Sequence, residues 1–388
     1  MKPLTTAALT TALLVPTLRV ATQPVIALQN EAPAVHSEGV DDGPYVFWRD
    51  AETAVLLSCC DGDVVQTIVE QITKPIQISP PCSPLTTIHL DPSPPQSPPA
   101  TWDMPTRLLA VSDLEGNYDT FVRFLKANNV IDDEGHWAWG DGHLVFVGDI
   151  VDRGDHVTEL LWYIRMLERE ARAADGHVHY ILGNHEAMVM AGDLRYIHPK
   201  YTATSKKLGH SYDALFGTST ELGRWLRTRN SIERIGPLLF VHAGYSPELD
   251  ELKLEPEQIN KRIQASLGPP KWPVRTELAT SLGWHGQGPF WYRGYFKQYA
   301  EKAGGVPSDE LLLKILNRHQ AKHIVVGHTV VDDITWIDEN NRIIGIDVKW
   351  SDPGEGEGLL IEDGTLLRVN MMGERLPFES PRNESKTK

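Results

Sequence analysis

Residues 144–154, Leu-Val-Phe-Val-Gly-Asp-Ile-Val-Asp-Arg-Gly, carry the strongest structural signal in the chain. The apolar run 144–147 is typical of a buried β-strand that stops at a glycine. Asp149, Asp152 and Arg153 follow at once, and crowded carboxylates at the end of a buried strand need a cation to offset their repulsion and lost hydration. Arg153 offers a fork of donors that matches phosphate oxygens. The stretch therefore predicts metal-assisted phosphoryl chemistry, with an ordinary surface turn as the alternative.

Four other apolar runs also end in polar side chains. Run 108–111 is followed by Asp113 and Glu115, run 178–182 by Asn184 and His185, run 237–241 by His242, and run 323–326 by His328. Helical patterns at 117–125 and 157–174 separate the runs 108–111, 144–147 and 178–182, and Asn117 is the expected N-cap of the first helix. Further helix is expected up to about residue 230. This alternation predicts an α/β fold with parallel strands, whose carboxyl ends form the site.

The assembled set contains carboxylates, imidazoles and an amide oxygen, which is the donor set of a two-metal hydrolase. Its motifs resemble those of the calcineurin-like metallophosphoesterases, most of all the phosphoprotein-phosphatase branch. The motifs are Gly-Asp-Ile-Val-Asp-Arg-Gly at 148–154, Gly-Asn-His-Glu at 183–186, Val-His-Ala-Gly at 241–244 and Gly-His-Thr at 327–329. Two further stretches, at 192–196 and 291–294, are similar to the bacterial Shewanella-like phosphatases. The resemblance, over about residues 107–370, implies a two-sheet αββα metallophosphoesterase sandwich.

The resemblance also implies roles for individual residues. Two divalent metal ions would be held by Asp113, Glu115 and Asp149 and by Asp149, Asn184, His242 and His328, with Asp149 bridging them. A metal-bridging hydroxide would attack phosphorus directly, without a phosphoenzyme. His185 would protonate the leaving group, and Asp152 would orient its imidazole. Substrate phosphate would be bound by Arg153, Arg293, Asn184 and Arg195; for Arg195, a structural ion pair is an equal alternative.

One ligand position departs from the family pattern. The family's first motif is Asp-x-His, and this chain has Asp113-Leu114-Glu115. A first metal held only by carboxylates favours Mn²⁺, with Fe, Zn²⁺ or Mg²⁺ as alternatives. If Glu115 capped the following helix instead, the first metal would be lost. The chain would then be an inactive phosphoesterase-fold binding module.

The remaining sequence divides into segments of distinct composition. The expected organisation is a signal peptide at 1–27, a small N-terminal β-unit at 41–74, a proline-rich linker at 75–105, the phosphoesterase domain at 106–375 and a disordered tail at 376–388. Lys2, an apolar stretch at 7–15 and small residues near 27 indicate export, to the periplasm or outside the cell, with organelle targeting as the alternative. Short strands at 334–337, 343–348, 359–361 and 366–369 would complete the fold.

Composition narrows the function further. A net charge of −15 argues against nucleic acid or an anionic membrane as the main partner, and no later segment predicts a membrane span. Cys59 or Cys60 could pair with Cys82 in an oxidising compartment, and no Cys-x5-Arg nucleophile is present. The sequence therefore predicts a phosphomonoesterase or protein phosphatase acting on a phosphorylated protein or a small phosphoester. A nucleotide or dinucleoside-polyphosphate phosphohydrolase is the enzymatic alternative; the side chain of a phosphoprotein substrate and the oligomeric state stay open.

Overall fold

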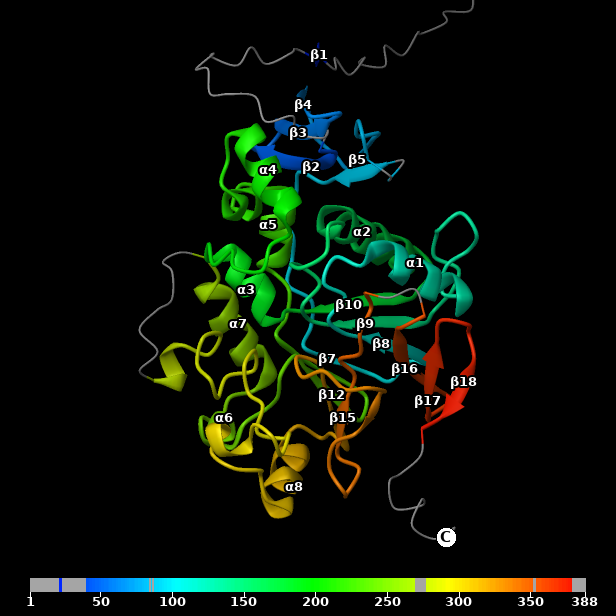
Figure 1. The fold of residues 1–388 in the computed structure, drawn as a ribbon, viewed down its shortest axis with the longest axis vertical. Helices are drawn as coiled ribbons and strands as arrows, with labels where there is room; N and C mark the ends of the chain where they lie inside the picture. Colours follow the sequence, from blue (N-terminus) through cyan, green and yellow to red (C-terminus); the bar gives the residue numbers. More distant parts are fainter. Residues whose placement is uncertain are drawn as a thin grey trace, which may run out of the picture.

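The computed structural model of the chain describes residues 21–22, 40–83, 85, 87–268, 277–351 and 354–378. Two six-stranded sheets lie at the centre of the main domain and are flanked by helices (Figure 1). The helices are α1 (Tyr118–Ala127), α2 (Val157–Ala173), α3 (Asn184–Met190), α4 (Pro199–Leu208), α5 (Glu221–Leu226), α6 (Pro247–Glu251), α7 (Pro256–Ser266) and α8 (Asp309–Arg318), with short 3-10 turns at Tyr212–Phe216, Leu278–Thr280 and Ala300–Ala303. This two-sheet α/β architecture agrees with the fold class that the sequence predicts.

The first sheet has the strand order β10-β9-β8-β16-β17-β18. Its strands are β8 (Arg107–Val111), β9 (His143–Val147), β10 (His177–Ile181), β16 (Glu357–Glu362), β17 (Thr365–Asn370) and β18 (Arg375–Pro377). Strands β8, β9 and β10 are parallel, and β16 to β18 extend the sheet in antiparallel fashion. Val111 pairs with Phe146 and Val147 pairs with Ile181, so the three parallel strands end at one edge.

The second sheet has the order β14-β15-β13-β12-β11-β7. Its strands are β7 (Thr101–Trp102), β11 (Ile232–Ile235), β12 (Leu238–Val241), β13 (His323–Val326), β14 (Thr335–Trp336) and β15 (Ile343–Gly345). Strands β12, β13 and β15 are parallel, so their carboxyl ends also meet at one edge. The polar residues that follow strands of both sheets are thereby brought together. Strands β11 and β18 were not predicted from the sequence.

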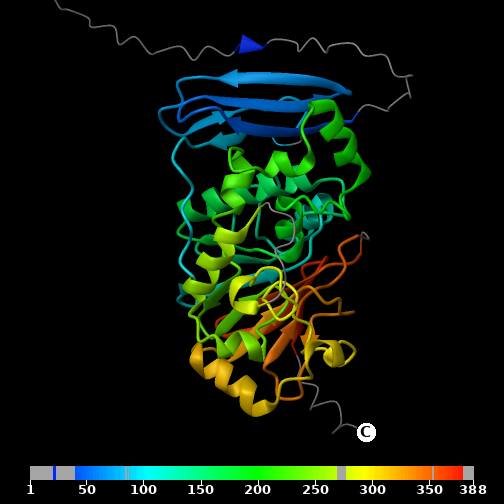
Figure 2. The same cartoon turned by 90° about the vertical axis from the view of Figure 1, so that its left-hand side faces the viewer.

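The N-terminal β-unit packs on the helices of the main domain (Figure 2). It contains β2 (Asp42–Trp48), β3 (Ala54–Cys60) and β4 (Asp63–Val69), and the short β1 (Ala21–Thr22) pairs with β4. Tyr45 Oη lies 2.9 Å from Thr158 Oγ1 of α2, and Trp162 of α2 donates from Nε1 to the Pro44 carbonyl at 2.9 Å. Both contacts are buried, so the β-unit shares a core with α2.

The proline-rich segment is not the predicted linker outside any sheet. Residues Ile76–Ile78 (β5) and Ile88–Leu90 (β6) form a two-stranded sheet, and β7 joins the edge of the second main sheet. The prediction was wrong because the prolines fall between these short strands and not within them, which spares every ladder hydrogen bond. A disulfide between Cys60 and Cys82 ties the segment to β3, and Cys59 is buried and free.

Two further predictions concern the start of α1 and the ends of the chain. Asn117 occupies the N-cap position of α1, but its side chain donates to the carbonyl of Leu114 at 2.9 Å and does not cap the helix. The predicted signal peptide, apart from residues 21–22, lies outside the described residues. Of the predicted disordered tail, 376–388, residues 376–377 instead belong to β18, and the part beyond residue 378 lies outside the described residues. No helix in the described part of the chain is long and apolar enough to cross a membrane.

Candidate active site

The loops that carry the predicted site have an uncommon backbone conformation. Six predicted site residues have φ between 46° and 73°, namely Asp113, Glu115, Asp149, Asp152, Arg153 and His328. L-residues avoid this left-handed region, and each such position costs on the order of 1–3 kcal/mol. The rest of the fold must hold these loops in place, which is a pattern that clusters at functional sites.

Glu186 is the main support of two of these loops. Its carboxylate accepts hydrogen bonds from the backbone N–H groups of Gly183 at 2.7 Å, Ile150 at 2.8 Å and Asp149 at 3.1 Å, and from Tyr180 Oη at 3.0 Å. These bonds join the loop after β9 to the loop after β10. Glu186 stands in a quoted motif, but its supporting role was not predicted.

Two glycines allow these loops to approach each other closely. A Cβ added at Gly183 would collide with Asp149 Oδ1, and one added at Gly327 would collide with Ser112 Oγ and Asp113 Oδ2. Carboxylate oxygens of the site therefore lie directly against the backbone of neighbouring strand ends. This close approach explains why glycine precedes both Asn184 and His328.

A cavity of about 390 Å³ opens at these strand ends. Most of the predicted site residues line it: Asp113, Glu115, Asp149, Arg153, Asn184, His185, Arg195, Arg293 and His328. The remaining two, Asp152 and His242, are buried at 1% and 0% exposure and contact the lining residues from behind. The structure therefore brings the residues that follow the strand ends together around one cavity.

Two groups of side chains in the described part of the chain could each hold a metal ion, and they share Asp149. One consists of Asp149, His242 and His328, and the other of Glu115, Asp149 and His185; the ligand atoms of each group lie within 4.8 Å of one another. Asn184 Oδ1 lies 3.1 Å from His242 Nε2, so it borders the first group. A shared carboxylate between two groups is the arrangement that a bridging ligand requires.

The electrostatics of the first group fit a cation. Burial alone would lower the pKa of His242, but the carboxylate of Asp149 outweighs it and raises that pKa to about 10. Burial and the neighbouring charge of His242 hold the pKa of His328 well below its usual value. The buried Nε2 of His328 has no hydrogen-bonding partner. A neutral imidazole with an unpartnered ring nitrogen beside a carboxylate suits a divalent metal.

Asp113 is placed differently from its predicted partners. Its Oδ2 accepts a hydrogen bond from Ser112 Oγ and another from the backbone N–H of His328 at 3.0 Å. Burial, reinforced by the charge of Asp149 against the opposing influence of His242, raises the pKa of Asp113 to about 6. Asp113 lines the cavity but belongs to neither three-residue group.

His185 and Asp152 form a close buried pair. His185 Nδ1 lies 2.7 Å from Asp152 Oδ2, and His185 Nε2 lies 3.7 Å from Asp149 Oδ2. Burial would lower the pKa of His185, but the charges of Asp149 and Asp152 raise it above its ordinary value. The imidazole is thereby oriented by one carboxylate, and its protonated form, which a proton donor needs, is favoured.

The three predicted phosphate-binding arginines have different surroundings. Arg153 forms an ion pair with Glu115 and lies 5.6 Å from the ring of Tyr196. Arg195 binds Asp193 through two hydrogen bonds, of 2.8 and 2.7 Å, which is the ion pair that the sequence left as the alternative. Arg293 lines the cavity and lies over the ring of Tyr299 at 5.1 Å.

Asp347 is a lining residue that sequence reasoning missed. It is 5% exposed, and burial, reinforced by the charge of Asp113, raises its pKa well above the ordinary value. The residue follows β15, which is parallel to β13, so the strand-end rule that located His328 applies to it as well. The sequence offered one signal for this residue, an aspartate standing within the otherwise apolar run 343–348.

Known phosphoesterases and phosphatases are similar to this chain in sequence. Residues 106–332 match the sequence profile of a family described as calcineurin-like phosphoesterase. Shewanella-like protein phosphatase 2 of Arabidopsis thaliana is 27% identical over 300 residues, which cover 66% of this chain and 74% of the relative. A symmetrical bis(5'-nucleosyl)-tetraphosphatase of Methylococcus capsulatus is 29% identical over 140 residues, 36% of this chain and 44% of that protein.

A solved structure covers nearly the whole described fold. The crystal structure of a cold-active protein-tyrosine phosphatase of a psychrophilic Shewanella species superposes with a TM-score of 0.80 and 34% sequence identity. The match covers 87% of this chain and 99% of that chain. The likeness therefore reaches beyond residues 106–332 and includes the N-terminal segments.

Proposed function

Because this chain belongs to the calcineurin-like phosphoesterase family and is a metal-dependent phosphatase, we propose that its substrates are proteins phosphorylated on tyrosine. The observation that carries the proposal is the 34% identity, in a match across 87% of the chain, to a protein described as a cold-active protein-tyrosine phosphatase. The Arabidopsis relative, named a protein phosphatase, supports the same substrate class. The dinucleoside-tetraphosphatase alternative rests on a match to only 36% of the chain.

The rim of the cavity suits an aromatic phosphoester. Tyr196, Trp291 and Trp350 line the cavity together with the metal-binding candidates. Tyr196 is 43% exposed and its ring lies 5.1 Å from that of His185. Aromatic side chains around an anionic head-group site favour a substrate with a planar ring. Of the stretch 290–292, Trp291 lines the cavity, whereas Phe290 and Tyr292 are core residues with 0% exposure.

We propose that two divalent metal ions, Mn²⁺ in preference to Fe, Zn²⁺ or Mg²⁺, complete the site. Asp149, His242, His328 and Asn184 would hold one ion, and Asp149, Glu115 and Asp113 the other. When bound, the ions would lower the pKa of a water to supply the nucleophile and would stabilise charge on the phosphoryl group. The preference for Mn²⁺ follows from the carboxylate Glu115 in place of an imidazole. Glu115→His should move this preference toward Zn²⁺ in a metal-competition assay.

The remaining side chains serve the substrate and the leaving group. His185 would donate a proton to the leaving phenolate oxygen, and Asp152 would fix its ring through the 2.7 Å contact at Nδ1. Arg153 and Arg293 would bind phosphate oxygens, and Arg153 would exchange its ion pair with Glu115 for the substrate. Arg195 is held by Asp193 and would contribute charge at the rim.

We also propose that the protein is exported. The sequence pattern at the N-terminus supports this, and so does the Cys60–Cys82 disulfide, because such bonds persist in oxidising compartments. Fusion of residues 1–40 to a reporter that is active only outside the cytoplasm tests the proposal. A reporter that stays inactive when it is expressed would contradict export.

The substrate proposal is tested by kcat/KM measurements on protein loaded with Mn²⁺. The substrates are a phosphotyrosine peptide, the same peptide with phosphoserine, and diadenosine tetraphosphate. We expect the phosphotyrosine peptide to be preferred by at least about tenfold, an advantage of roughly 1.4 kcal/mol in transition-state binding. Preference for the dinucleotide or for phosphoserine would overturn the proposal. Asp149→Asn, purified in parallel, reports any contaminating phosphatase.

A further inference from the structure

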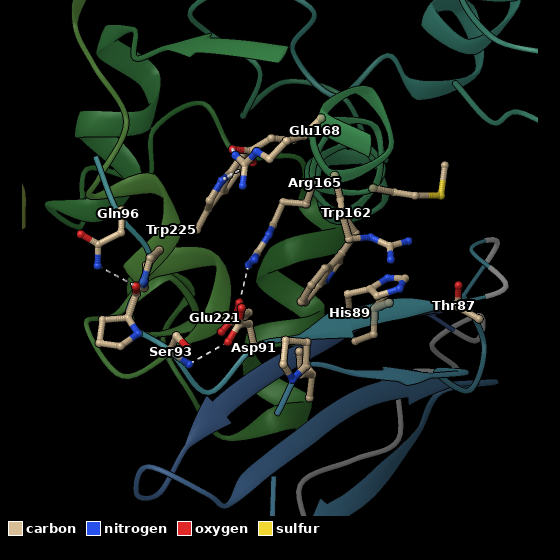
Figure 3. Close-up of a pocket in the computed structure, with 18 of the residues that line it drawn as sticks. Thr87, His89, Asp91, Ser93, Gln96, Trp162, Arg165, Glu168, Glu221 and Trp225 are labelled. Carbon is tan, nitrogen blue, oxygen red and sulfur yellow. Dashed lines mark hydrogen bonds and ion pairs between the residues drawn. The ribbon is translucent and has the colours of Figure 1, made fainter. Parts of the chain in front are cut away.

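A second cavity, of about 440 Å³, lies between the proline-rich segment and the helices α2 and α5 (Figure 3). One wall comes from β6 and the residues up to Gln96, and the opposite wall from α2, α5 and Arg229. None of its lining residues lines the metal-binding cavity. A volume of several hundred Å³ is that of pockets that enclose small organic ligands.

The apolar part of this cavity offers flat aromatic surfaces. Trp162 and Trp225, which are 3% and 2% exposed, stand in its helical wall, and Ile88 and Leu90 of β6 face it from the other side. Arg165 reaches toward Glu221 between the two tryptophans, as Figure 3 shows, and its guanidinium lies 5.6 Å from the ring of Trp162. Such walls favour a ligand with a planar apolar body.

Most of the charges in the cavity are already paired. Arg165 bonds to Glu221 at 2.6 Å, and Glu168 accepts hydrogen bonds from Arg229 at 3.0 Å and Arg172 at 3.3 Å. Four arginines line the cavity against three acidic residues, so cationic side chains are in excess. The paired charges form a fixed frame, and the excess charge is available to a ligand.

The excess charge belongs to Arg169. Among the residues that the structure describes, Arg169 forms no hydrogen bond and no ion pair through its side chain. Arg169 is exposed at the edge of the cavity, and its partial burial lowers its pKa against the opposing influence of the Glu170 charge. His89 of β6 also lines the cavity, and its buried Nε2 has no hydrogen-bonding partner. An anion placed between these groups would gain a strong donor without breaking an existing pair.

We propose that this cavity binds a planar organic anion, an aromatic carboxylate or a close analogue, with its anionic head on Arg169 and its apolar body between β6 and Trp162. The site is separate from the phosphatase centre and needs no metal ion. Because α2 begins at Val157, four residues after Arg153, a ligand on this helix contacts an element that also leads to the metal-binding cavity.

The proposal is tested with 2-naphthoate, whose binding to the full, metal-depleted chain is measured by isothermal titration calorimetry. Metal depletion removes from the phosphatase centre the ions to which a carboxylate would bind. The uncharged isostere 2-naphthamide is titrated in parallel. We expect naphthoate to bind at least about tenfold more tightly than naphthamide, because a hydrogen bond to a charged group is worth roughly that factor.

Two variants and a matched control locate the binding. Arg169→Ala should weaken naphthoate at least about tenfold and leave naphthamide unchanged. Met166→Glu places a carboxylate in the half-buried wall and should weaken naphthoate further. Arg123→Ala removes an exposed arginine from α1, outside the cavity, and should not change the affinity. Equal affinity of Arg169→Ala and wild type, equal loss in Arg123→Ala, or no preference over naphthamide would overturn the proposal. Thermal melts confirm that each variant is folded.

Discussion

The metal-binding cavity and the arginine–tryptophan cavity are similar in size, at about 390 and 440 Å³, but they are built in different ways. The first is made of strand-end loops with six residues at positive φ, and buried like charges face one another there. The second is made of helix faces and a short hairpin, and two of its three carboxylates, Glu221 and Glu168, are paired with arginines. The first therefore costs stability in the absence of metal, whereas the charges of the second contribute to it.

Isosteric removal of one charge from each cavity gives the largest effects and tests this contrast. Asp149→Asn removes the carboxylate that both candidate metal groups share. We expect kcat on p-nitrophenyl phosphate to fall roughly a thousandfold, because loss of metal-assisted charge stabilisation costs several kcal/mol. The bound metal, measured by elemental analysis, should fall as well. Activity within a few-fold of wild type would show that Asp149 does not organise the centre.

Glu168→Gln is the matching change in the arginine–tryptophan cavity. Glu168 accepts hydrogen bonds from Arg229, Arg172 and the Trp225 Nε1 at 3.0 Å. We expect the free energy of unfolding to fall by about 2–3 kcal/mol in urea titrations at pH 7, because a buried arginine loses its partner.

The difference in unfolding free energy between wild type and Glu168→Gln should depend on pH, and this dependence is the control for the prediction. Burial would raise the pKa of Glu168, but Arg229 and Arg165 hold it below its ordinary 4.5. A lowered pKa in the folded state gives stability above pH 4.5 that is lost as the pH falls. The gap between wild type and Glu168→Gln should therefore narrow below pH 4.5. A gap that widens in acid would contradict the pairing.

Asp152→Asn separates positioning from catalysis in the metal-binding cavity. The substitution removes a carboxylate that raises the pKa of His185. We expect kcat to fall by about ten- to a hundredfold. A proton donor is active while it is protonated, so the alkaline limb of the kcat–pH profile should move to lower pH in the variant. An unmoved limb would mean that His185 is not the donor.

The smallest effect concerns Asp347. Burial raises its pKa in the folded state, so its charge opposes folding increasingly as the pH rises above its ordinary value of 3.8. We expect Asp347→Asn to stabilise the metal-free protein at pH 7 by on the order of 1 kcal/mol. The same variant should gain less stability from added Mn²⁺ than wild type does. A destabilised metal-free variant would show that the first cavity is not strained by its charges.

The different construction of the two cavities also explains which of their residues could be predicted from the sequence. The strand-end rule located Asp149, His242 and His328 because parallel strands bring their carboxyl ends to one edge, so local motifs imply a shared site. It missed Asp347 because a lone aspartate within an apolar run forms no motif. The ion pair between Glu115 and Arg153 depends on loop conformation, which the sequence does not specify.

The arginine–tryptophan cavity could not be predicted in this way. His89, Arg169 and Trp225 lie on three segments that are far apart in the chain, and none stands in a recognisable pattern. The proline-rich segment was interpreted as a linker, because composition reports the conformations that proline excludes but not the short strands between prolines.

The packing of the β-unit on α2 bears on whether the main domain can fold without the N-terminal segments. The family profile begins at residue 106, which invites the view that everything before it is an optional extension. A chain shortened to that point would leave Trp162 Nε1 and Thr158 without Pro44 and Tyr45, and the second sheet without β7. The N-terminal segments thus share the core of the main domain, and we expect a chain that begins at residue 106 to be less stable than the full chain.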